Sequence, residues 1–509
     1  MIAAATLGEL VARRAAETPR ADVVRAQGER LDAQALDERT RRVAGALASA
    51  GVLPGHRVAL VAGNGIDFFV AWLGIVRAGG MVVPAQTSLR ERDLGHVLRH
   101  SGARLVLADS ASAATVRAAM VGTRVTDVWV DLDRARRAAP GVPPSAAPAD
   151  AVGLQYTSGT TGLPKGCVLT HESWLHMASA VAGHAPFGPD DVALTAQPAS
   201  YMDPIWNLIL GLLCGMPLVV LPRFSASTFW RTVAEAGATF FYCIGTMPQL
   251  LLRQPRDPAE RQHRVRLVLC SGIPAATHAA IEARWGCPWR EAYGTTELGA
   301  VLLSAVEDTG DVGTGALGQV VAGKEIRVVR DDGREGAPGD MGELWVRGQG
   351  LMRGYFDDPA ATAAWCPDGW ARTGDLVARD ADGRLRFVAR RRDVIRRGGQ
   401  NISAAEVEAA LAEHPGVKVA ACVPVPDDIY GEEVKAYVLP LGPGVVEPAA
   451  LASFVRERLA GFKTPRWIEL VDELPMTPSE RVAKHLLVSS RPDLRVGSFD
   501  TVAGRWFTP

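Results

Sequence analysis

The sequence has little that would indicate a disulfide scaffold, a zinc site or a membrane span. Its seven cysteines are scattered, with no Cys-x-x-Cys pair, which is typical of buried thiols in a reducing cytoplasm. The longest apolar run, residues 208–221, contains two glycines and a proline and is too short to cross a bilayer. The formal net charge is only -1, so no global field favours nucleic acid or an anionic membrane. We therefore expect a cytoplasmic protein without nucleic-acid or membrane partners.

The length and the pattern of the chain predict a multidomain α/β protein. A chain of 509 residues is too long for one ordinary core. Short β-branched runs alternate with helical patterns through the first three quarters, for example a strand at 57–62, a helix at 67–78 and a strand at 81–84. This alternation is typical of stacked mixed or parallel sheets covered by helices.

After residue 313 the sequence pattern changes and predicts short strands separated by turns. A candidate boundary follows at the charged run 390–393, and Ser403 with Glu406 forms a capping-box pattern that predicts a helix at 404–413. We predict a large N-terminal domain at 1–390 and a small α+β C-terminal lid at 391–509.

Residues 156–166, Tyr-Thr-Ser-Gly-Thr-Thr-Gly-Leu-Pro-Lys-Gly, are the most informative stretch. Glycines let backbone N–H groups approach an anion, hydroxyls add donors, and a lysine adds a point charge. The spacing is not that of the Walker loop. The stretch predicts a nucleotide-phosphate loop, with a flexible surface loop as the alternative. Its candidate phosphate ligands are Thr157, Ser158, Gly159, Thr160, Thr161 and Lys165.

This loop resembles the phosphate loop of adenylate-forming enzymes, the superfamily of acyl-CoA synthetases, adenylation domains and luciferases. Residues 293–297, Tyr-Gly-Thr-Thr-Glu, match the Tyr-Gly-x-Thr-Glu motif of that superfamily. The resemblance implies that Tyr293 stacks on adenine, that Thr296 touches the phosphates and that Glu297 holds Mg²⁺. Gly294 and Thr295 join them as nucleotide-binding residues. It also implies a lid that rotates between two catalytic poses about a hinge near Arg392.

Further segments match the same superfamily. Asp375, in Trp-Ala-Arg-Thr-Gly-Asp, occupies the place of the aspartate that takes the ribose hydroxyls, and Arg390 that of an arginine reaching the ribose. A carboxylate can accept from both hydroxyls. The alternatives are an exposed turn for Asp375 and a solvated strand edge for Arg391 and Arg396. Residues 342–355 match a structural motif, and we assign them no chemistry.

Two glycine-containing segments are assigned by resemblance to the acyl and coenzyme A sites. Ser271 and Gly272 belong to a loop beside the acyl pocket, and we count them among the nucleotide-binding residues. Gly398 and Gly399 match the lid segment that lines the pantetheine tunnel in CoA-forming members, where a side chain would obstruct the path. A plain Gly-Gly turn is the alternative.

The acyl pocket is predicted from aromatic and apolar residues, namely Tyr201, Trp206, Tyr242 and Ile273. Tyr201 takes the position of a histidine or aromatic residue in relatives. These side chains favour an apolar or cyclic acyl group, and an ordinary core role is the alternative for each.

One departure from the superfamily pattern bears on catalysis. Relatives read Pro-x-Thr-x-x-Gly-Lys near the C-terminus, and that lysine bridges the carboxylate and the α-phosphate during adenylation. Here Glu480 and Arg481 stand for the glycine and the lysine. The planar guanidinium is bulkier than an ammonium group, and Glu480 adds negative charge beside the phosphates. Lys484, three residues on, is not expected to substitute.

The sequence therefore predicts an acyl-CoA ligase, an acid–thiol ligase that uses ATP/AMP, Mg²⁺ and coenzyme A. Its catalytic candidates are Lys165, Thr296, Glu297 and Arg481. Either Arg481 replaces the lysine, or adenylation is weak and the enzyme takes acyl-AMP made by a separate adenylating enzyme. The alternatives are an amide-forming or carrier-loading adenylating enzyme, against which residues 398–399 and the lack of an attached carrier segment count, and a nucleotide-binding protein without catalysis. The sequence is silent on oligomeric state, and a homodimer stays one option.

Overall fold

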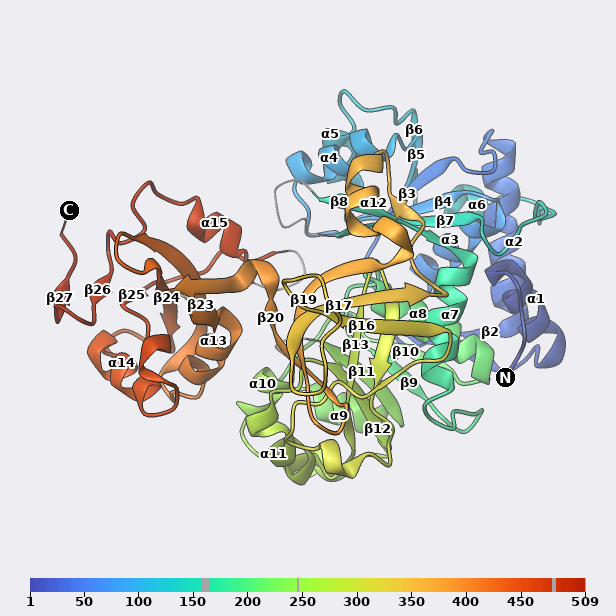
Figure 1. Ribbon diagram of the computed structural model, residues 1–509. Helices are drawn as coiled ribbons and strands as arrows, with labels where there is room; N and C mark the ends of the chain where they lie inside the picture. Colours follow the sequence, from blue (N-terminus) through green and yellow to red (C-terminus); the bar gives the residue numbers. More distant parts are fainter. Residues whose placement is uncertain (158–163, 245–246, 399, 478–481, 509) are drawn as a thin grey trace. The chain divides into compact units, whose positions relative to one another are not determined.

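The computed structural model describes residues 1–157, 164–244, 247–398, 400–477 and 482–508. These residues divide into two compact units (Figure 1). The first unit takes 1–157, 164–326 and 346–371, and the second takes 327–345 and 372–508. The predicted α/β class is confirmed. The domain boundary predicted near residue 390 falls within the second unit and stays a prediction.

Two sheets organise the first unit. In the larger sheet the strand order is β15 (Gln319–Val320), β14 (Gly299–Leu303), β13 (Trp289–Thr295), β12 (Leu267–Ser271), β11 (Phe240–Ile244), β9 (Ala193–Thr195), β10 (Leu218–Val220), β1 (Asp22–Ala26) and β2 (Glu29–Asp32). The pairs from β13 to β1 are parallel, and antiparallel strands close both edges. The sequence pattern predicted such largely parallel pairing.

The second sheet of this unit carries the stem of the predicted phosphate loop. Its strand order is β18 (Gly354–Tyr355), β8 (Lys165–Thr170), β7 (Ala151–Thr157), β4 (Met81–Pro84), β3 (Arg57–Val61), β5 (Leu105–Ala108) and β6 (Asp127–Val130). The pairs from β7 to β6 are parallel, whereas β7 with β8 and β8 with β18 are antiparallel. The hairpin β7–β8 therefore places both ends of the loop at one point.

Helices surround and separate these two sheets. They are α1 (Leu7–Glu17), α2 (Ala33–Ser49), α3 (Ile66–Arg77), α4 (Glu91–Ser101), α5 (Ala113–Ala119), α6 (Asp133–Arg137), α7 (His171–Ala182), α8 (Met202–Cys214), α9 (Phe229–Glu235), α10 (Met247–Leu252), α11 (Ala275–Trp285) and α12 (Pro359–Trp365). The apolar run 208–221 forms the end of α8 and then β10. No helix among the described residues is long and apolar enough to cross a membrane.

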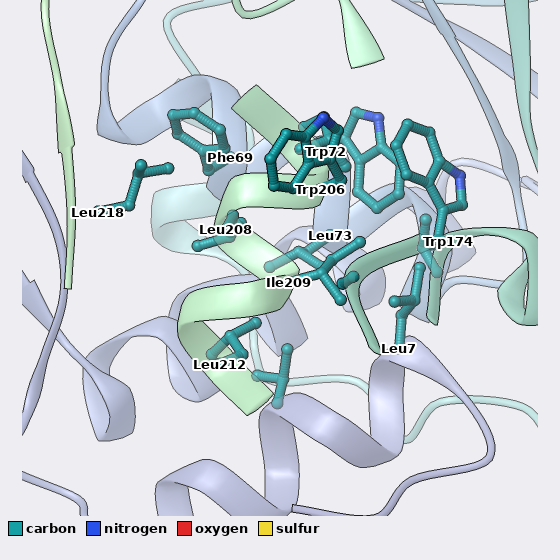
Figure 2. Packing of buried hydrophobic residues seen from close by; sticks show 14 of the residues in the cluster. Leu7, Phe69, Trp72, Leu73, Trp174, Trp206, Leu208, Ile209, Leu212 and Leu218 are labelled. Atoms are coloured by element: carbon teal, nitrogen blue, oxygen red, sulfur yellow. The ribbon is translucent and has the colours of Figure 1, made fainter. Parts of the chain in front are cut away.

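The main core of the first unit lies where α3, α7 and α8 pack between the sheets. The cluster includes strand residues of both sheets, such as Leu60 and Leu218. Figure 2 shows Leu218 of this cluster with Phe69 and the tryptophans Trp72, Trp174 and Trp206. Trp72 of α3 and Trp174 of α7 meet edge to face, with ring centres 5.4 Å apart. Burying one such side chain contributes on the order of 2 kcal/mol or more. This middle layer includes α8, the helix that carries Trp206 and has Tyr201 as its N-cap residue.

The second unit contains a mixed sheet covered by helices. Its strands run in the order β22 (Gln400–Ser403), β21 (Val394–Arg397), β24 (Gly431–Pro440), β25 (Trp467–Leu470), β26 (Phe499–Asp500) and β27 (Arg505–Trp506), with β23 (Val417–Asp427) also paired to β24. Its helices are α13 (Ala404–Ala412), α14 (Pro448–Arg456) and α15 (Lys484–Val488). The Ser403 hydroxyl caps α13 as predicted, by accepting from the backbone N–H of Glu406. The Glu406 carboxylate instead accepts from Lys463.

A further sheet, in the order β16 (Lys324–Val329), β17 (Met341–Gly348), β19 (Ala371–Arg379) and β20 (Leu385–Arg390), precedes this part of the chain. Most of its residues belong to the second unit. Its antiparallel pair β19–β20 places Asp375 directly opposite Arg390.

A buried carboxylate on β13 fixes the loop that follows β12. Glu291 accepts hydrogen bonds from the backbone N–H groups of Gly272, at 2.7 Å, and Ile273, at 2.8 Å. Burial raises the pKa of Glu291 to about 7, although these N–H groups and that of Ala292 act to lower it. The folded chain therefore holds a proton on Glu291 at pH values where the unfolded chain has lost it.

We predict that Glu291 makes the free energy of unfolding depend on pH. Its folded pKa of about 7 lies above the ordinary 4.5. The stabilising contribution is therefore complete below pH 4.5 and is lost as the pH rises to about 7. That difference in pKa corresponds to about 3 kcal/mol. Urea unfolding of wild type and Glu291→Gln across this window should show a shallower decline in the variant, because glutamine does not titrate.

The exposed Glu335→Gln variant, whose carboxylate pairs only loosely with Arg327 at 3.7 Å, is the matched control and should keep the wild-type slope. Equal slopes for wild type and Glu291→Gln would contradict the assignment.

Candidate active site

The stem of the predicted phosphate loop is a two-stranded hairpin in the first unit. Thr157 of β7 pairs with Lys165 of β8, and Tyr156 pairs with Gly166. Four of the predicted loop ligands, Ser158, Gly159, Thr160 and Thr161, lie outside the described residues. The register nevertheless brings two predicted ligands, Thr157 and Lys165, directly opposite each other.

The motif at 293–297 forms the tight connection from β13 to β14. Gly294 lies opposite Ala300, and Thr295 lies opposite Gly299. A Cβ added to Gly294 would lie 2.4 Å from the carbonyl oxygen of Gly299, so only glycine fits there. Thr296 and Glu297 follow in the turn, and both are half-buried. Glu297 therefore lies in the connection where β14 returns closely against β13.

The structure places the Glu297 carboxylate within a cluster of the first unit. It accepts a hydrogen bond from the Tyr355 hydroxyl at 3.3 Å, and its charge and hydrogen bonding help to raise the pKa of the buried Cys167 thiol. Burial, followed by Glu297, raises the pKa of Tyr355, so its hydroxyl stays a proton donor. The Lys165 ammonium lies 5.1 Å from the centre of the Tyr355 ring and 3.6 Å from the carboxylate of Asp358. Two predicted catalytic residues, Lys165 and Glu297, thus meet around Tyr355.

A buried lysine supports the residue after Glu297. Lys324 of β16 is 7% exposed and donates to the carbonyl of Leu298 at 2.6 Å. Burial lowers the pKa of Lys324 to about 7, and Glu172 acts in the opposite direction. Lys324 thus contacts the residue directly after the motif 293–297 through this hydrogen bond. It forms no ion pair with another described residue.

Two of the predicted acyl-pocket residues, Trp206 and Tyr242, pack together. The Tyr242 hydroxyl and the Ser271 hydroxyl share a hydrogen bond of 2.7 Å, and Trp206 meets the Tyr242 ring edge to face at 5.3 Å. Burial raises the pKa of Tyr242 well above its ordinary value. Ile273 is buried in the loop held by Glu291. Tyr201 is the N-cap residue of α8, the helix that carries Trp206.

In the second unit, the two predicted ribose residues form an ion pair. The Asp375 carboxylate is fully buried and lies 2.7 Å from Nε of Arg390. Asp375 is thus not an exposed turn residue. Arg391, for which a solvated edge was an alternative, lies 2.8 Å from the carboxylate of Asp331 and 3.2 Å from that of Glu343. The side chain of Arg392, the predicted hinge residue, lies outside the described part.

The glycine predicted to line the coenzyme A tunnel lies against an aromatic side chain. Gly398 has φ of 54° and donates its N–H to the carbonyl of Tyr430 at 2.8 Å. A Cβ added to it would lie 3.1 Å from the Tyr430 ring, which explains glycine there by local packing alone. Gly399 lies outside the described residues.

The residues on the two sides of Glu480 and Arg481 contact each other through their backbones. Met476 bridges Val482, and the N–H of Ala483 donates to the carbonyl of Pro475 at 2.7 Å. Glu480 and Arg481 lie outside the described residues.

Lys484, which follows Ala483, forms ion pairs with two carboxylates. Its ammonium lies 2.7 Å from the carboxylate of Glu408 and 3.9 Å from that of Asp393. Burial opposes its charge, but these two carboxylates outweigh burial and raise the pKa of Lys484. Its ammonium group is therefore engaged within the second unit, in line with the expectation that it does not substitute for the missing lysine.

Glu297, the predicted Mg²⁺ ligand, is a single carboxylate, which suits an ion that is also bound by a substrate. In the part of the chain that the structure describes, no three His, Cys, Asp or Glu side chains gather to hold a metal ion. Mg²⁺ commonly takes one or two carboxylates and completes its shell with water and substrate phosphates. The single carboxylate of Glu297, near Lys165, suits that arrangement.

Sequence reasoning missed several residues that touch the candidate site. Tyr355 and Glu343 belong to the segment 342–355, to which no chemistry was assigned, yet Tyr355 donates to Glu297, and Glu343 accepts from the N–H of Gly374 at 2.9 Å. Cys167, two residues after Lys165, had no distinguishing spacing. The one sequence signal for Lys324 is that it lies on the same strand face as the apolar residues Ile326 and Val328.

The chain is similar to known proteins along most of its length. Residues 11–356 match the family model AMP-binding enzyme, and residues 406–481 match the AMP-binding enzyme C-terminal domain. The chain is 34% identical to a sulfoacetate–CoA ligase of Cupriavidus necator over 95% of this chain and 97% of that protein. It is 32% identical to a feruloyl-CoA synthase of an Amycolatopsis species, with 94% and 97% covered.

The fold is also that of a solved relative. ATP-bound MatB from Rhodopseudomonas palustris superposes with a TM-score of 0.86 at 27% identity, covering 95% of this chain and 98% of that one. The two curated relatives are, by name, ligases that join an acid to coenzyme A, which is the enzyme class predicted from the sequence. With its phosphate-loop stem, its Glu297 cluster and both family models matched, the chain belongs to the AMP-binding enzyme family.

Proposed function

We propose that the chain is an acyl-CoA ligase that converts a carboxylic acid, ATP and coenzyme A into an acyl-CoA thioester, AMP and pyrophosphate. A carboxylate oxygen attacks the α-phosphorus of ATP, and pyrophosphate leaves. The sulfur of coenzyme A then attacks the acyl carbon, and AMP leaves as the thiol proton is lost. The meeting of Lys165 and Glu297 around Tyr355 carries this proposal.

The first step gathers negative charge, which the proposed residues would offset. Lys165 would contact the phosphates of ATP, and its present partner Asp358 holds it only loosely, at 3.6 Å with both side chains more than a third exposed. Glu297 would bind Mg²⁺, and the hydroxyl of Thr296 would donate to a phosphate oxygen. Such fixed charges and donors favour a transition state in which charge develops on phosphate oxygens.

The remaining nucleotide and coenzyme A contacts are proposed by position in the matched motifs. Tyr293 would stack on adenine, and Asp375 with Arg390 would bind the ribose. Gly398 and Gly399 would leave room for pantetheine. We propose an apolar or cyclic acyl group, because Trp206, Tyr242 and Ile273 present mainly carbon surface. The substrate partners are thus small molecules, either the free acid or its acyl-AMP.

A second candidate is a ligase that receives acyl-AMP from a separate adenylating enzyme. It is favoured by Glu480 and Arg481 in place of glycine and lysine, together with the engagement of Lys484 by Glu408 and Asp393. In this case the missing lysine would not prevent the thioester step, because the ammonium group that bridges the carboxylate and the α-phosphate acts in adenylation.

The proposed reaction is tested with the wild-type protein and a panel of acids. Aromatic, alicyclic and short charged acids are each incubated with ATP, Mg²⁺ and coenzyme A, and then with an amine or a carrier protein in place of coenzyme A. We expect an aromatic or alicyclic acid to give a CoA thioester and equimolar AMP. Product formed only with the amine or the carrier protein would overturn the proposal.

Replacing Glu297 should impair adenylation more than folding. Glu297→Gln keeps the side-chain volume and the hydrogen bond to Tyr355 but removes the charge proposed for Mg²⁺. We expect pyrophosphate release to fall about 10²–10³-fold and the Mg²⁺ concentration for half-maximal rate to rise. Glu335→Gln is the matched control. An unchanged Mg²⁺ dependence in Glu297→Gln would rule out the metal role.

The two candidates differ in what Arg481 does. If Arg481 replaces the lysine, Arg481→Ala should lower pyrophosphate release about 10²–10³-fold, while thioester formation from supplied acyl-AMP stays near wild type. If adenylation is weak, the wild type should release little pyrophosphate, and Glu480→Gly with Arg481→Lys should raise that release at least about tenfold.

Lys484 supplies the control for this experiment. The double variant Lys484→Met with Glu408→Gln removes both members of the ion pair, so no unpaired charge is left between them. It should keep the ratio of the two half-reactions close to wild type. A selective loss of pyrophosphate release in this variant would show that Lys484 is the adenylation cation.

A further inference from the structure

Two histidines of α4 contact the two ends of the phosphate-loop stem. His100 Nδ1 lies 2.7 Å from the Tyr156 hydroxyl, before the loop, and His96 Nε2 lies 3.4 Å from the carbonyl oxygen of Pro164, after it. Residues four apart lie on the same face of a helix, and here the two rings have centres 5.6 Å apart. A single helix face therefore contacts the chain on both sides of residues 158–163.

The contact with Tyr156 lies in a packed environment. The His100 ring meets the rings of Tyr156 and Phe356 edge to face, at 5.7 and 5.8 Å. Phe356 also donates its N–H to the carbonyl of Gly166 at 2.8 Å, and Gly166 lies opposite Tyr156 in the stem. Displacing His100 would thus disturb both strands of the hairpin.

The protonation states suit a neutral hydrogen bond. Burial, followed by the neighbouring His96, lowers the pKa of His100, although Asp357 and Asp358 act to raise it. Burial raises the pKa of Tyr156, with Ser101 and Arg57 acting to lower it. Around neutral pH the imidazole is therefore uncharged and the hydroxyl protonated, which is a pair able to share one hydrogen.

The same cluster reaches the predicted phosphate-binding lysine. Asp358, one of the carboxylates that act on His100, pairs with Lys165 at 3.6 Å. Lys165 is the first residue of β8, next to Pro164. The histidine face, the acidic pair Asp357–Asp358 and the stem lysine thus form one connected group in the first unit.

We propose that His96 and His100 are positioning residues for the nucleotide-phosphate loop, holding its two stems in the spacing that ATP binding requires. The proposal rests on the function proposed above, because it assumes that the loop binds ATP. Neither histidine is assigned contact with substrate. Their effect should therefore be confined to ATP binding and adenylation and should leave the thioester step from supplied acyl-AMP unaffected.

A double-mutant cycle on full-length protein tests the contact between His100 and Tyr156. His100→Leu and Tyr156→Phe each remove the hydrogen bond from one side, and His100→Gln keeps a group able to make it. We expect each of the first two variants to weaken ATP binding, measured by calorimetry without acid, about fivefold, the size of one neutral hydrogen bond. The combined variant should be no weaker than either alone, and His100→Gln should stay within about twofold of wild type.

The second half of the test separates positioning from general damage. Thioester formation from supplied acyl-AMP should stay near wild type in all variants. His184→Leu is the matched control, because the Nδ1 of His184 contacts the carbonyl of Ala180 on α7 at 3.2 Å. It should leave ATP binding unchanged. His96→Leu should weaken ATP binding as His100→Leu does.

Three outcomes would overturn the inference: unchanged ATP binding in both His100→Leu and Tyr156→Phe, full additivity of the two losses, or an equal loss in the acyl-AMP assay. Tyr156→Phe keeps the test decisive if His100→Leu fails to fold. A wild-type protein that binds ATP and forms thioester while its variants match it would refute the positioning role alone. A wild-type protein that does neither would refute the proposed function as well.

Discussion

The hydrogen bond from the Tyr355 hydroxyl to the Glu297 carboxylate is the interaction on which the candidate site depends. It joins the turn after β13 to β18, which itself pairs with β8, the strand that begins at Lys165. In that turn Gly294 lets β14 return in close contact with β13, because a side chain there would collide with the backbone of Gly299. Because burial, followed by Glu297, raises the pKa of Tyr355, its hydroxyl is the donor in this bond and the carboxylate of Glu297 is the acceptor. A lysine and a carboxylate far apart in the sequence thereby become neighbours.

The two lysines near functional motifs differ in how firmly they are held. Lys165 pairs with Asp358 at 3.6 Å at a partly exposed position, so a phosphate could replace that carboxylate at small cost. Lys484 lies 2.7 Å from Glu408, whose pKa is raised by burial. Breaking such a half-buried pair leaves an uncompensated charge and is costly. The strength and exposure of its ion pair, and not its position in the sequence, therefore distinguish a lysine that can bind substrate from one that stabilises the fold.

Much of the fold could be predicted from local pattern. The helix expected at 67–78 is α3, the strand expected at 81–84 is β4, and the apolar run 208–221 divides into a helix and a strand. Each of these segments is rich in apolar residues and is bounded or divided by glycine or proline, so its type follows from short-range rules. The division into compact units was less accessible, because residues 327–345 join the second unit through pairing with strands later in the chain. Such pairing leaves no local mark in the sequence.

The family, the predicted phosphate loop and the roles proposed for Glu297 and Asp375 could be predicted from the amino-acid sequence, because glycines, hydroxyls and charges at fixed spacing carry their chemistry wherever the chain folds. The groups that surround these residues became known from the fold. Tyr355 next to Glu297, Arg390 opposite Asp375, Glu291 beneath the loop at 271–273 and the histidines of α4 against the loop stem all come from strand pairing and helix packing between distant segments. Side-chain partners of that kind depend on register and burial, which are properties of the whole fold and not of any one motif.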